Sequence, residues 1–503
     1  MDMVISAISD VFLPLNILWF LGGTALGIVA GVLPGVGASL TMALLIPITF
    51  YLDKTTGLMT LVSAWAGAVY GGSISSILIN TPGTGANVAT CFDGFPMARN
   101  GKAKVALGIS ATSSMIGGLF GITVLILFSP YISKISVMFG AAEYFLLAIF
   151  GLTVTSSTIK GSTLKGLISS GVGLMISFIG YDIITGTKRY TFHTMYLEDG
   201  IDFLIVVIGF FAVTQLFSFL SEQGSISQAG KIEGKISEGI KLTFKHIKVA
   251  LTSSIIGTIF GFAPGVGTTA ASLVAYSAAE GGSDHPEDFG KGIPEGIVAA
   301  EASNNAVQGG ALIPTLTLGI PGNSDSAVFL AGLMMYGINP GRNLYETNSH
   351  LLYVLFIALL LAQVAFWIVG MLFTPIFAKI TLVPIKILLP IIWIVACLGA
   401  FALNNEFIDC IVIIIMGVIG YLMKKLDYPT VPLLMGVILG HLAEKNFARA
   451  MMISDNSLIC FVDSPICWVI WILIALSIIL PRMLSKRSER KRALRAAKEP
   501  EEE

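Results

Sequence analysis

Apolar segments recur along the whole length of this chain, and they constrain its fold more than any other feature. Examples are residues 203–220, 351–373, 411–423 and 468–480. Only 12% of the 503 residues are charged, whereas soluble domains carry about 25%. Since a helix needs roughly 20 apolar residues to cross a bilayer, the sequence predicts an all-α polytopic membrane protein. We expect about 12–16 membrane segments, including broken or re-entrant helices.

Two polar stretches divide the chain. Residues 222–248 carry five lysines, and residues 485–503 form a basic run with an acidic end. An excess of Lys and Arg marks the cytoplasmic side of a membrane protein. We therefore expect a first membrane repeat at 1–221, a cytoplasmic central polar loop at 222–248, a second membrane repeat at 249–484 and a charged tail at 485–503. The tail places the C-terminus in the cytoplasm.

Residues typical of enzymes and metal sites are sparse and scattered. The five cysteines form no CxxC pair, and the five histidines form no HExxH pair. The chain also has no GxxxxGK[ST] phosphate-binding loop, GxGD aspartate or GxSG serine. We predict that the protein is not an enzyme and uses no metal, organic cofactor or ATP.

Two motifs that interrupt apolar sequence occur in both halves of the chain, in the same order. The sequence PGVG stands at 34–37 and again at 264–267. Pro82-Gly83 is likewise matched by Pro321-Gly322, at nearly the same separation. This order and spacing predict two internal repeats, each with two broken helices.

The orientation of the two repeats depends on the number of membrane crossings between them. Roughly seven crossings separate Pro34 from Pro264, an odd number that makes the repeats inverted. If residues 57–80 only re-enter the membrane, the number is even and the repeats are parallel. We favour the inverted arrangement.

The interruptions are candidate ligand sites because unpaired backbone groups are costly in lipid and survive only inside protein or beside a polar cavity. A broken helix exposes N–H groups at a new N-terminus, where the helix dipole favours an anion. Interrupted helices at matching positions in two halves indicate the binding site of a secondary transporter. The alternative is that the four breaks are kinks that relieve packing. We expect residues 80–87 and 320–326 to be unwound tips that meet near the bilayer midplane.

A polar face precedes the second Pro-Gly break. Glu301, Asn304, Asn305 and Gln308 lie at i, i+3, i+4 and i+7, so a helix places them on one side. This side cannot face acyl chains, because a carboxylate in the bilayer costs about 2.5–3.5 kcal/mol. The face therefore lines a site or forms a hydrogen-bonded seam between helices.

The first half has a neutral counterpart of this face. Ser73, Ser76 and Asn80 lie at i, i+3 and i+7 before the first Pro-Gly break. Small hydroxyl residues also hold membrane helices together, so both a lining and a structural role are open. We expect the segment after the break, which contains Asp93, to form a surface loop.

Five ordered motifs resemble the TctA family, the large membrane subunit of tripartite tricarboxylate transporters. They are GVLPGVG, GGSISSILINTPG, DGFPMARNGKAKVALGISA, FGKGIPEGIVAAEASNNA and LTLGIPG, and the likeness covers about residues 15–480. The resemblance implies a multi-pass protein of the prokaryotic cell (inner) membrane. It also implies two partners, a small four-helix membrane subunit and an extracytoplasmic solute-binding protein. The implied activity is import of small carboxylates driven by a Na⁺ or H⁺ gradient.

The breaks and the resemblance together give the predicted site. Glu301 and Asp325 are the predicted coupling-ion residues. The sequence departs from the family pattern at 323–325, where an extra carboxylate leaves citrate itself in doubt. The residues predicted to bind substrate are Pro34, Gly35, Gly37, Asn80, Thr81, Pro82, Gly83, Thr84, Pro264, Gly265, Gly267, Asn304, Asn305, Pro321, Gly322, Asn323 and Ser324; the family motif also includes Asp93 and Gly94.

The broken helices and the family resemblance are consistent with two functions. The first is the large subunit of a secondary active importer of small carboxylates, fed by a solute-binding protein. The second is a channel-like or assembly component without coupled transport. Gradient-dependent, concentrative uptake distinguishes the first from the second.

Overall fold

The computed structural model describes residues 2–33, 35–136, 138–158, 163–182, 185–221, 234–380 and 385–479. These residues are helical except for connecting segments and one pair of two-residue strands, β1 and β2, which are antiparallel. Pro34, the first part of the 222–248 segment and the tail at 485–503 lie outside the described residues.

The chain forms two compact units. Unit 1 comprises Met1–Val137 and Asp202–Leu426 and contains all four predicted breaks. Its helices are α1 (Asp2–Val11), α2 (Pro14–Val32), α3 (Ala38–Thr49), α4 (Lys54–Ile79), η1 (Gly85–Asn87), α5 (Val88–Met97), η2 (Ala98–Lys102), α6 (Ala103–Ser136), α9 (Phe203–Ile208), η4 (Gly209–Val213), α10 (Thr214–Ser221), α11 (Ile236–Lys245), α12 (Ile247–Phe262), α13 (Gly267–Gly282), η5 (Pro286–Asp288), α14 (Pro294–Leu318), α15 (Ser324–Met335), α16 (Arg342–Glu346), α17 (Ser349–Leu372), α18 (Thr374–Ile380), α19 (Ile385–Asn404) and α20 (Phe407–Lys425).

Unit 2 comprises Met138–Ile201 and Asp427–Glu503. In it, α21 packs against both α7 and α8. Its elements are α7 (Ala141–Thr158), α8 (Thr163–Ser177), β1 (Gly180–Tyr181), β2 (Lys188–Arg189), η3 (Met195–Leu197), α21 (Thr430–Ile453), η6 (Leu458–Phe461) and a last apolar helix at Pro465–Ile479.

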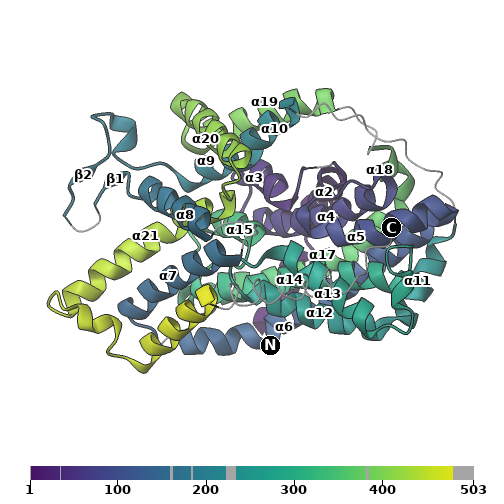
Figure 1. The fold of residues 1–503 in the computed structure, drawn as a ribbon. Coiled ribbons are helices and arrows are strands. Elements are labelled where there is room, and N and C mark those ends of the chain that lie inside the picture. Colours follow the sequence, from purple (N-terminus) through teal and green to yellow (C-terminus); the bar gives the residue numbers. More distant parts are fainter. Residues whose placement is uncertain are drawn as a thin grey trace, which may run out of the picture. The chain divides into compact units, whose positions relative to one another are not determined.

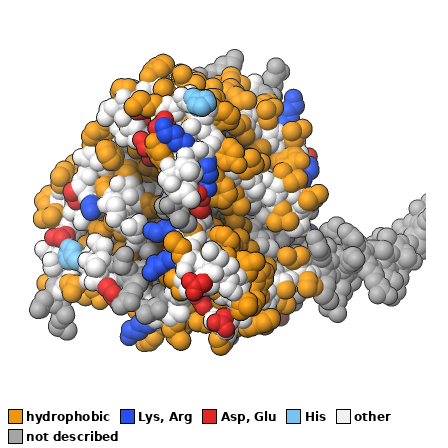
Figure 2. Space-filling model, turned by 90° about the vertical axis from the view of Figure 1, so that its left-hand side faces the viewer, with side chains coloured by type: hydrophobic (Ala, Val, Ile, Leu, Met, Phe, Trp, Pro, Cys, Tyr) orange, Lys and Arg blue, Asp and Glu red, His pale blue; other side chains and the backbone are white. Residues whose placement is uncertain are grey.

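The all-helical membrane fold is confirmed. In the part of the chain that the structure describes, six helical stretches are long and apolar enough to cross a membrane, and further apolar helices are shorter. Large apolar side chains such as Leu18, Leu398 and Trp468 are exposed, and Figure 2 shows hydrophobic side chains over much of the face in view. This surface is suited to lipid, because lipid imposes no cost on exposed apolar groups.

Two helix pairs in unit 1 pack in the same way. In Figure 1, α2 lies beside α4, and α12 lies beside α14. A Cβ on Gly31 would lie 2.1 Å from the carbonyl oxygen of Ala68, and one on Gly261 would lie 2.5 Å from that of Val307. The sequence distance from Gly31 to Gly261 equals the distance between the two PGVG motifs. The distance from Ala68 to Val307 likewise equals the distance between the two Pro-Gly motifs. Such close approach needs small residues, and it occurs at equivalent places in both halves.

All four predicted interruptions are breaks between helices. The chain leaves helical geometry between α2 and α3, between α4 and η1, between α12 and α13, and between α14 and α15. Asn80 and Gly319, which occupy equivalent positions in the two halves, both end their helices in the left-handed conformation, with φ of 54° and 72°. The unwound parts are shorter than predicted, because residues 85–87 form a 3₁₀ turn and residues 324–326 form the first turn of α15.

The 222–248 segment is not only a loop. Its described part contains α11, and α12 begins at Ile247. Gly239 of α11 lies close enough to α6 for an added Cβ to come within 2.3 Å of the Val105 carbonyl oxygen. The predicted repeat boundaries and the inverted orientation remain predictions.

Candidate functional site

Each Pro-Gly break is hydrogen-bonded to the PGVG break of its own half. The N–H of Gly35 donates to the carbonyl of Gly83 at 3.1 Å, and the N–H of Gly265 donates to the carbonyl of Gly322 at 2.9 Å. Gly35 and Gly265 have φ of 81° and 79°, a conformation that glycine adopts without steric cost. These equivalent bonds fix the two broken helices of each half against each other.

The helix that follows each Pro-Gly break has its own polar cap. Thr84 accepts a hydrogen bond from the N–H of Ala86 at 3.2 Å. Asn323, at the equivalent position of the second half, forms a capping box with Ser326, in which each side chain accepts from the other's backbone N–H. Both caps use the first N–H groups that the break exposes. The side chains of Thr84 and Asn323 therefore hold the tips rather than projecting freely from them.

Contacts between the two halves are reciprocal. The Ser39 hydroxyl on α3 donates to a carboxylate oxygen of Asp325 on α15. In the equivalent place, an added Cβ on Gly85 at the start of η1 would lie 2.5 Å from Oγ1 of Thr269 on α13. The helix after each PGVG break thus contacts the helix after the other half's Pro-Gly break. Reciprocal contacts of this kind are what a two-fold relationship produces.

The carboxylate of Glu301, from α14, is fully buried and receives hydrogen bonds from three hydroxyls. Ser73 on α4 and Ser114 on α6 donate to its Oε2 at 2.8 and 2.7 Å. Thr90 on α5 donates to its Oε1. All three donors come from the first half of the chain and Glu301 comes from the second. Among the described residues no Lys, Arg or His forms an ion pair with this carboxylate.

A chain of hydrogen bonds joins the first Pro-Gly tip to Glu301. The Thr84 hydroxyl donates to Oδ1 of Asn87 at 2.7 Å, and Nδ2 of Asn87 donates to Oγ of Ser73 at 2.8 Å. Ser73 in turn donates to Glu301. Every donor in this chain points toward the carboxylate, so Thr84, Asn87, Ser73 and Glu301 form one directed hydrogen-bond network.

The rest of the α14 polar face is buried but only partly satisfied. Asn304 is 1% exposed, and neither of its amide atoms has a hydrogen-bond partner in the part of the chain that the structure describes. Asn305 donates to the backbone carbonyl of Glu301 at 3.2 Å, but its Oδ1 lacks a partner. Gln308 accepts from Gln363 at 3.0 Å. Hydrogen bonds between helices therefore account for the Glu301 carboxylate and for Oε1 of Gln308, whereas Nε2 of Gln308 and both amide atoms of Asn304 lack a partner among the described residues.

Asp93 does not lie in a surface loop, as the sequence suggested. It is a fully buried residue of α5. Its Oδ1 accepts from the backbone N–H groups of Gly290, Gly292 and Ile293 at 2.9, 2.8 and 3.0 Å. Its Oδ2 accepts from the Tyr276 hydroxyl at 2.8 Å. Asp93 thus fixes the turn that precedes α14 and positions the helix that carries Glu301.

Some residues of this cluster were missed by sequence reasoning. Ser114, Thr90 and Asn87 are common residue types in unremarkable contexts, and only their contacts identify them. Gln363 did carry a signal, because it is a polar residue in the middle of the apolar helix α17, where a polar group needs a partner. Ser76 is structural, since its hydroxyl donates to the carbonyls of Gly72 and Asn87.

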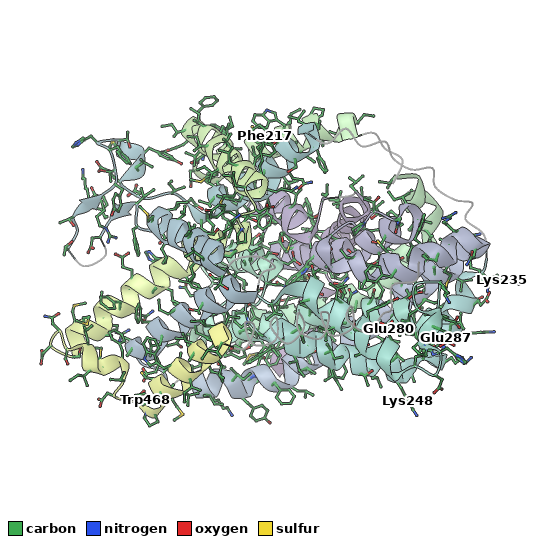
Figure 3. The ribbon with its side chains drawn as sticks, viewed as in Figure 1. Phe217, Lys235, Lys248, Glu280, Glu287 and Trp468 are labelled. Carbon is green, nitrogen blue, oxygen red and sulfur yellow. The ribbon has the colours of Figure 1, made fainter. Side chains whose placement is uncertain are left out.

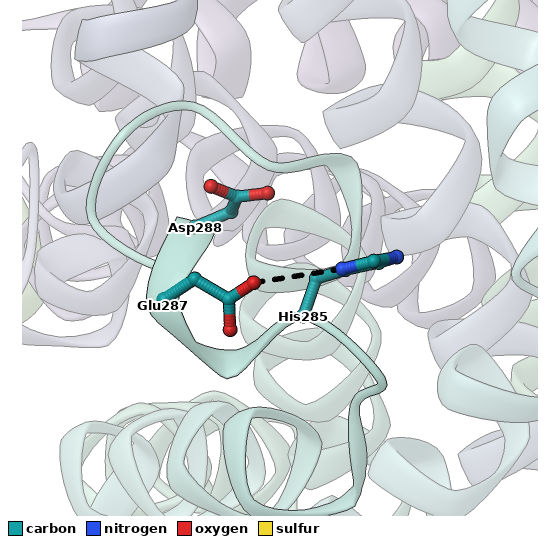
Figure 4. Close-up of side chains that lie close together, drawn as sticks. All are labelled: His285, Glu287 and Asp288. Atoms are coloured by element: carbon teal, nitrogen blue, oxygen red, sulfur yellow. Dashed lines mark ion pairs between the residues drawn. The ribbon is translucent and has the colours of Figure 1, made fainter.

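The charged side chains of α11–α13 and η5 include several on the surface. Lys235, Lys248, Glu280 and Glu287 are exposed at the periphery of α11–α13 and η5 (Figure 3). Within the described residues, His285, Glu287 and Asp288 are close enough to share an ion (Figure 4). All three are exposed, and His285 pairs with Glu287 at 3.6 Å, so the group needs no ion to explain it.

Helices broken at matching places, with a buried carboxylate held between the two halves, define a multi-pass helical membrane protein with a repeated core. Residues 17–435 match the family described as Tripartite tricarboxylate transporter TctA family. The chain belongs to this family, the membrane component of tripartite tricarboxylate transporters, and is not an enzyme.

Two relatives come from Agrobacterium vitis. The chain is 35% identical over 480 residues to the uncharacterized 52.8 kDa protein in the TAR-I ttuC' 3' region, and the match covers 95% of each chain. It is 32% identical over 234 residues to the uncharacterized protein in the TAR-II ttuC' 3' region, covering 46% of this chain and 97% of that protein. No solved structure matches the chain.

Proposed function

We propose that this chain is the large membrane subunit of a secondary active importer of small carboxylates. A solute-binding protein on the extracytoplasmic side delivers the substrate, a small four-helix membrane subunit completes the complex, and an ion gradient drives uptake. The membrane is the prokaryotic cell (inner) membrane, with the C-terminus in the cytoplasm. Membership of the TctA family supports the substrate class and the tripartite assembly.

The observation that carries the proposal is the environment of Glu301. A buried carboxylate without a cationic side chain is costly unless it is neutralised or binds a cation. Three hydroxyls surround it, and each can turn its lone pairs toward a bound cation or donate to the empty carboxylate. Glu301 is therefore the proposed site of the coupling Na⁺ or H⁺. Its hydrogen-bond chain to Thr84 links ion binding to the tip.

The substrate site is proposed at the broken helices beside the Asn304 face. The dipole at a helix N-terminus attracts an anion, and such termini hold the substrate carboxylate in transporters with discontinuous helices. The amide of Asn304 supplies a donor and an acceptor that no other described residue uses. Asp325 already accepts from Ser39, so we place it as a second ion site rather than as a substrate contact.

Uptake into proteoliposomes tests the proposal. The full transporter is reconstituted with both partner subunits, and uptake of labelled mono-, di- and tricarboxylates is measured with an imposed Na⁺ gradient, with a pH gradient and with neither. Concentrative uptake under one gradient supports coupled import. Uptake that only equilibrates under every condition supports the channel-like alternative.

A further inference from the structure

The hairpin, which here means the paired strands β1 and β2 together with the residues that follow β2 as far as Glu198, carries exposed apolar side chains. Phe192 and Met195 are 77% and 87% exposed, and Tyr190 is 55% exposed. They lie beyond the end of α8, outside the candidate membrane spans. Large exposed apolar side chains gathered on a polar segment mark an interaction site, and Tyr, Phe and Met are enriched in protein interfaces.

The backbone of this segment is strained in the same place. Tyr190, Phe192 and His193 have φ of 54°, 47° and 59°, a region that aromatic residues rarely occupy. Such strain persists only where surrounding structure enforces it, and it clusters at sites that clamp a ligand or partner. The strain and the exposure coincide at Tyr190 and Phe192, although each is an independent observation.

Ion pairs supply the structure that enforces this conformation. Arg189, at the base of the exposed segment, pairs with Asp182 at 3.1 Å and with Glu444 of α21 at 2.5 Å. Lys188 pairs with Glu198 at 2.6 Å, and this hydrogen bond lowers the pKa of the Glu198 carboxyl. The exposed residues between these anchors are thus held in place before any partner binds, which lowers the entropic cost of docking.

Contacts within unit 2 indicate which end of the membrane helices the hairpin occupies. The Lys165 ammonium at the start of α8 lies 5.0 Å from the ring of Tyr428, just before α21. Farther along, an added Cβ on Gly440 of α21 would touch Ser177 at the end of α8, and beyond it Glu444 contacts the hairpin. The two helices therefore run in parallel, with their starts at one end and the hairpin at the other.

The distribution of basic residues indicates the side of the membrane. Residues 178–202 carry two basic and four acidic side chains, and the candidate span Phe203–Leu220 separates them from the central polar segment 222–248, which carries five lysines. Since an excess of Lys and Arg marks the cytoplasmic side, the hairpin falls on the extracytoplasmic side.

We propose that Tyr190, Phe192 and Met195 form the docking surface for a soluble extracytoplasmic protein. This inference rests on the proposed function only for the identity of that partner, the solute-binding protein. The matching surface on the partner is an apolar hollow with a neutral or basic rim, complementary to the acidic excess of the hairpin. The alternative is that these side chains insert among lipid headgroups. The charged groups interleaved with the apolar residues disfavour this insertion.

Photo-crosslinking identifies the occupant. A benzoylphenylalanine is placed at Phe192 in the full-length chain in its native host, and the adduct is identified by mass spectrometry. An adduct with a solute-binding protein is the expected result. A lipid adduct, an adduct with a cytoplasmic or membrane protein, or no adduct in cells that import carboxylate overturns the proposal.

Reconstitution then tests function with the protein so identified. In the Phe192→Ala and Met195→Ala double variant, the concentration of that protein needed for half-maximal uptake should rise at least about tenfold, with the maximal rate unchanged. Leu164→Ala with Met175→Ala, exposed on α8, is the matched control and should behave as wild type. If the wild-type chain imports carboxylate and the double variant reaches half-maximal uptake at the same partner concentration, the proposed docking surface is wrong. If wild type shows no uptake, the proposed function is wrong, and the crosslink alone decides this inference.

Discussion

The hydroxyl of Ser73 donates a hydrogen bond to Oε2 of Glu301 at 2.8 Å, and this bond joins the two halves of the chain. Ser73 lies on α4, which ends at the first Pro-Gly break, and Glu301 lies on α14, which ends at the second. The two helices that lead into the breaks are thus connected through a single buried carboxylate. An ion bound at Glu301 would act on both breaks at once.

Removing the charge of Glu301 should abolish coupling without unfolding the protein. Glu301→Gln keeps the size of the side chain and an oxygen that accepts hydrogen bonds, so we expect correct insertion and normal thermal stability. Uptake should lose its dependence on the ion gradient or fail. Ion-dependent uptake equal to wild type would mean that the carboxylate only holds helices together.

Asn304→Leu separates a binding role from a structural role. The buried amide makes no hydrogen bond to any described residue, so a leucine of similar size should leave the free energy of unfolding unchanged or raise it. If the amide binds substrate, apparent substrate affinity should fall about tenfold, since one hydrogen bond contributes about 1.4 kcal/mol or less. Titration of uptake against substrate concentration checks this, and unchanged affinity would exclude Asn304 from the site.

Valine at Gly83 or Gly322 should impair folding rather than merely crowd a ligand. A Cβ on Gly83 would lie 2.4 Å from the Gly72 Cα, and one on Gly322 would lie 2.5 Å from the Gly261 carbonyl oxygen. Overpacking of this kind costs about 1–3 kcal/mol or more. Gly267→Ala is the control, because open space surrounds it and only its φ of 80° is unfavourable, at about 1–2 kcal/mol. Thermal unfolding in detergent should rank Gly267→Ala as the milder change.

Asp93 is predicted to stabilise the start of α14. Asp93→Ala leaves three backbone N–H groups and the Tyr276 hydroxyl without their acceptor, which should cost about 3–5 kcal/mol. Tyr276→Phe removes one donor only and should cost about 1 kcal/mol. Limited proteolysis near residues 283–293 should be faster in Asp93→Ala than in Tyr276→Phe. Equal protection in the two variants would contradict this role.

Asp325→Asn should change ion dependence more than substrate choice. Asparagine retains an oxygen for the Ser39 hydroxyl, so α3 and α15 should remain in contact while the charge is lost. We expect the ion concentration that gives half-maximal uptake to shift, with the ranking of carboxylates preserved. Ser39→Ala is the matched variant that keeps the charge. A changed substrate ranking in Asp325→Asn would place this residue in the substrate site instead.

The sequence by itself determined the fold class and the places where helices break. Long apolar runs require helices in a membrane because backbone groups must be paired within each segment. Pro82-Gly83 and Pro321-Gly322 end helices through local backbone chemistry, which needs no knowledge of distant residues. The shared face of Glu301 and Asn304 likewise follows from helical periodicity alone.

Only the tertiary structure decided what those residues contact. Sequence spacing placed Asp93 in a surface loop, yet the turn at 290–293, in the other half of the chain, surrounds its carboxylate. Local propensity does not encode a long-range contact of this kind. The same limit applies to Ser114 and Thr90, which are ordinary hydroxyl residues until packing brings them to Glu301.

Glu301 and Asn304 share one face of one helix, but three neighbouring helices satisfy the first and leave the second unpaired. That difference depends on how the helices pack, because hydrogen bonds form over about 3 Å and a helix face alone does not specify what lies at that distance.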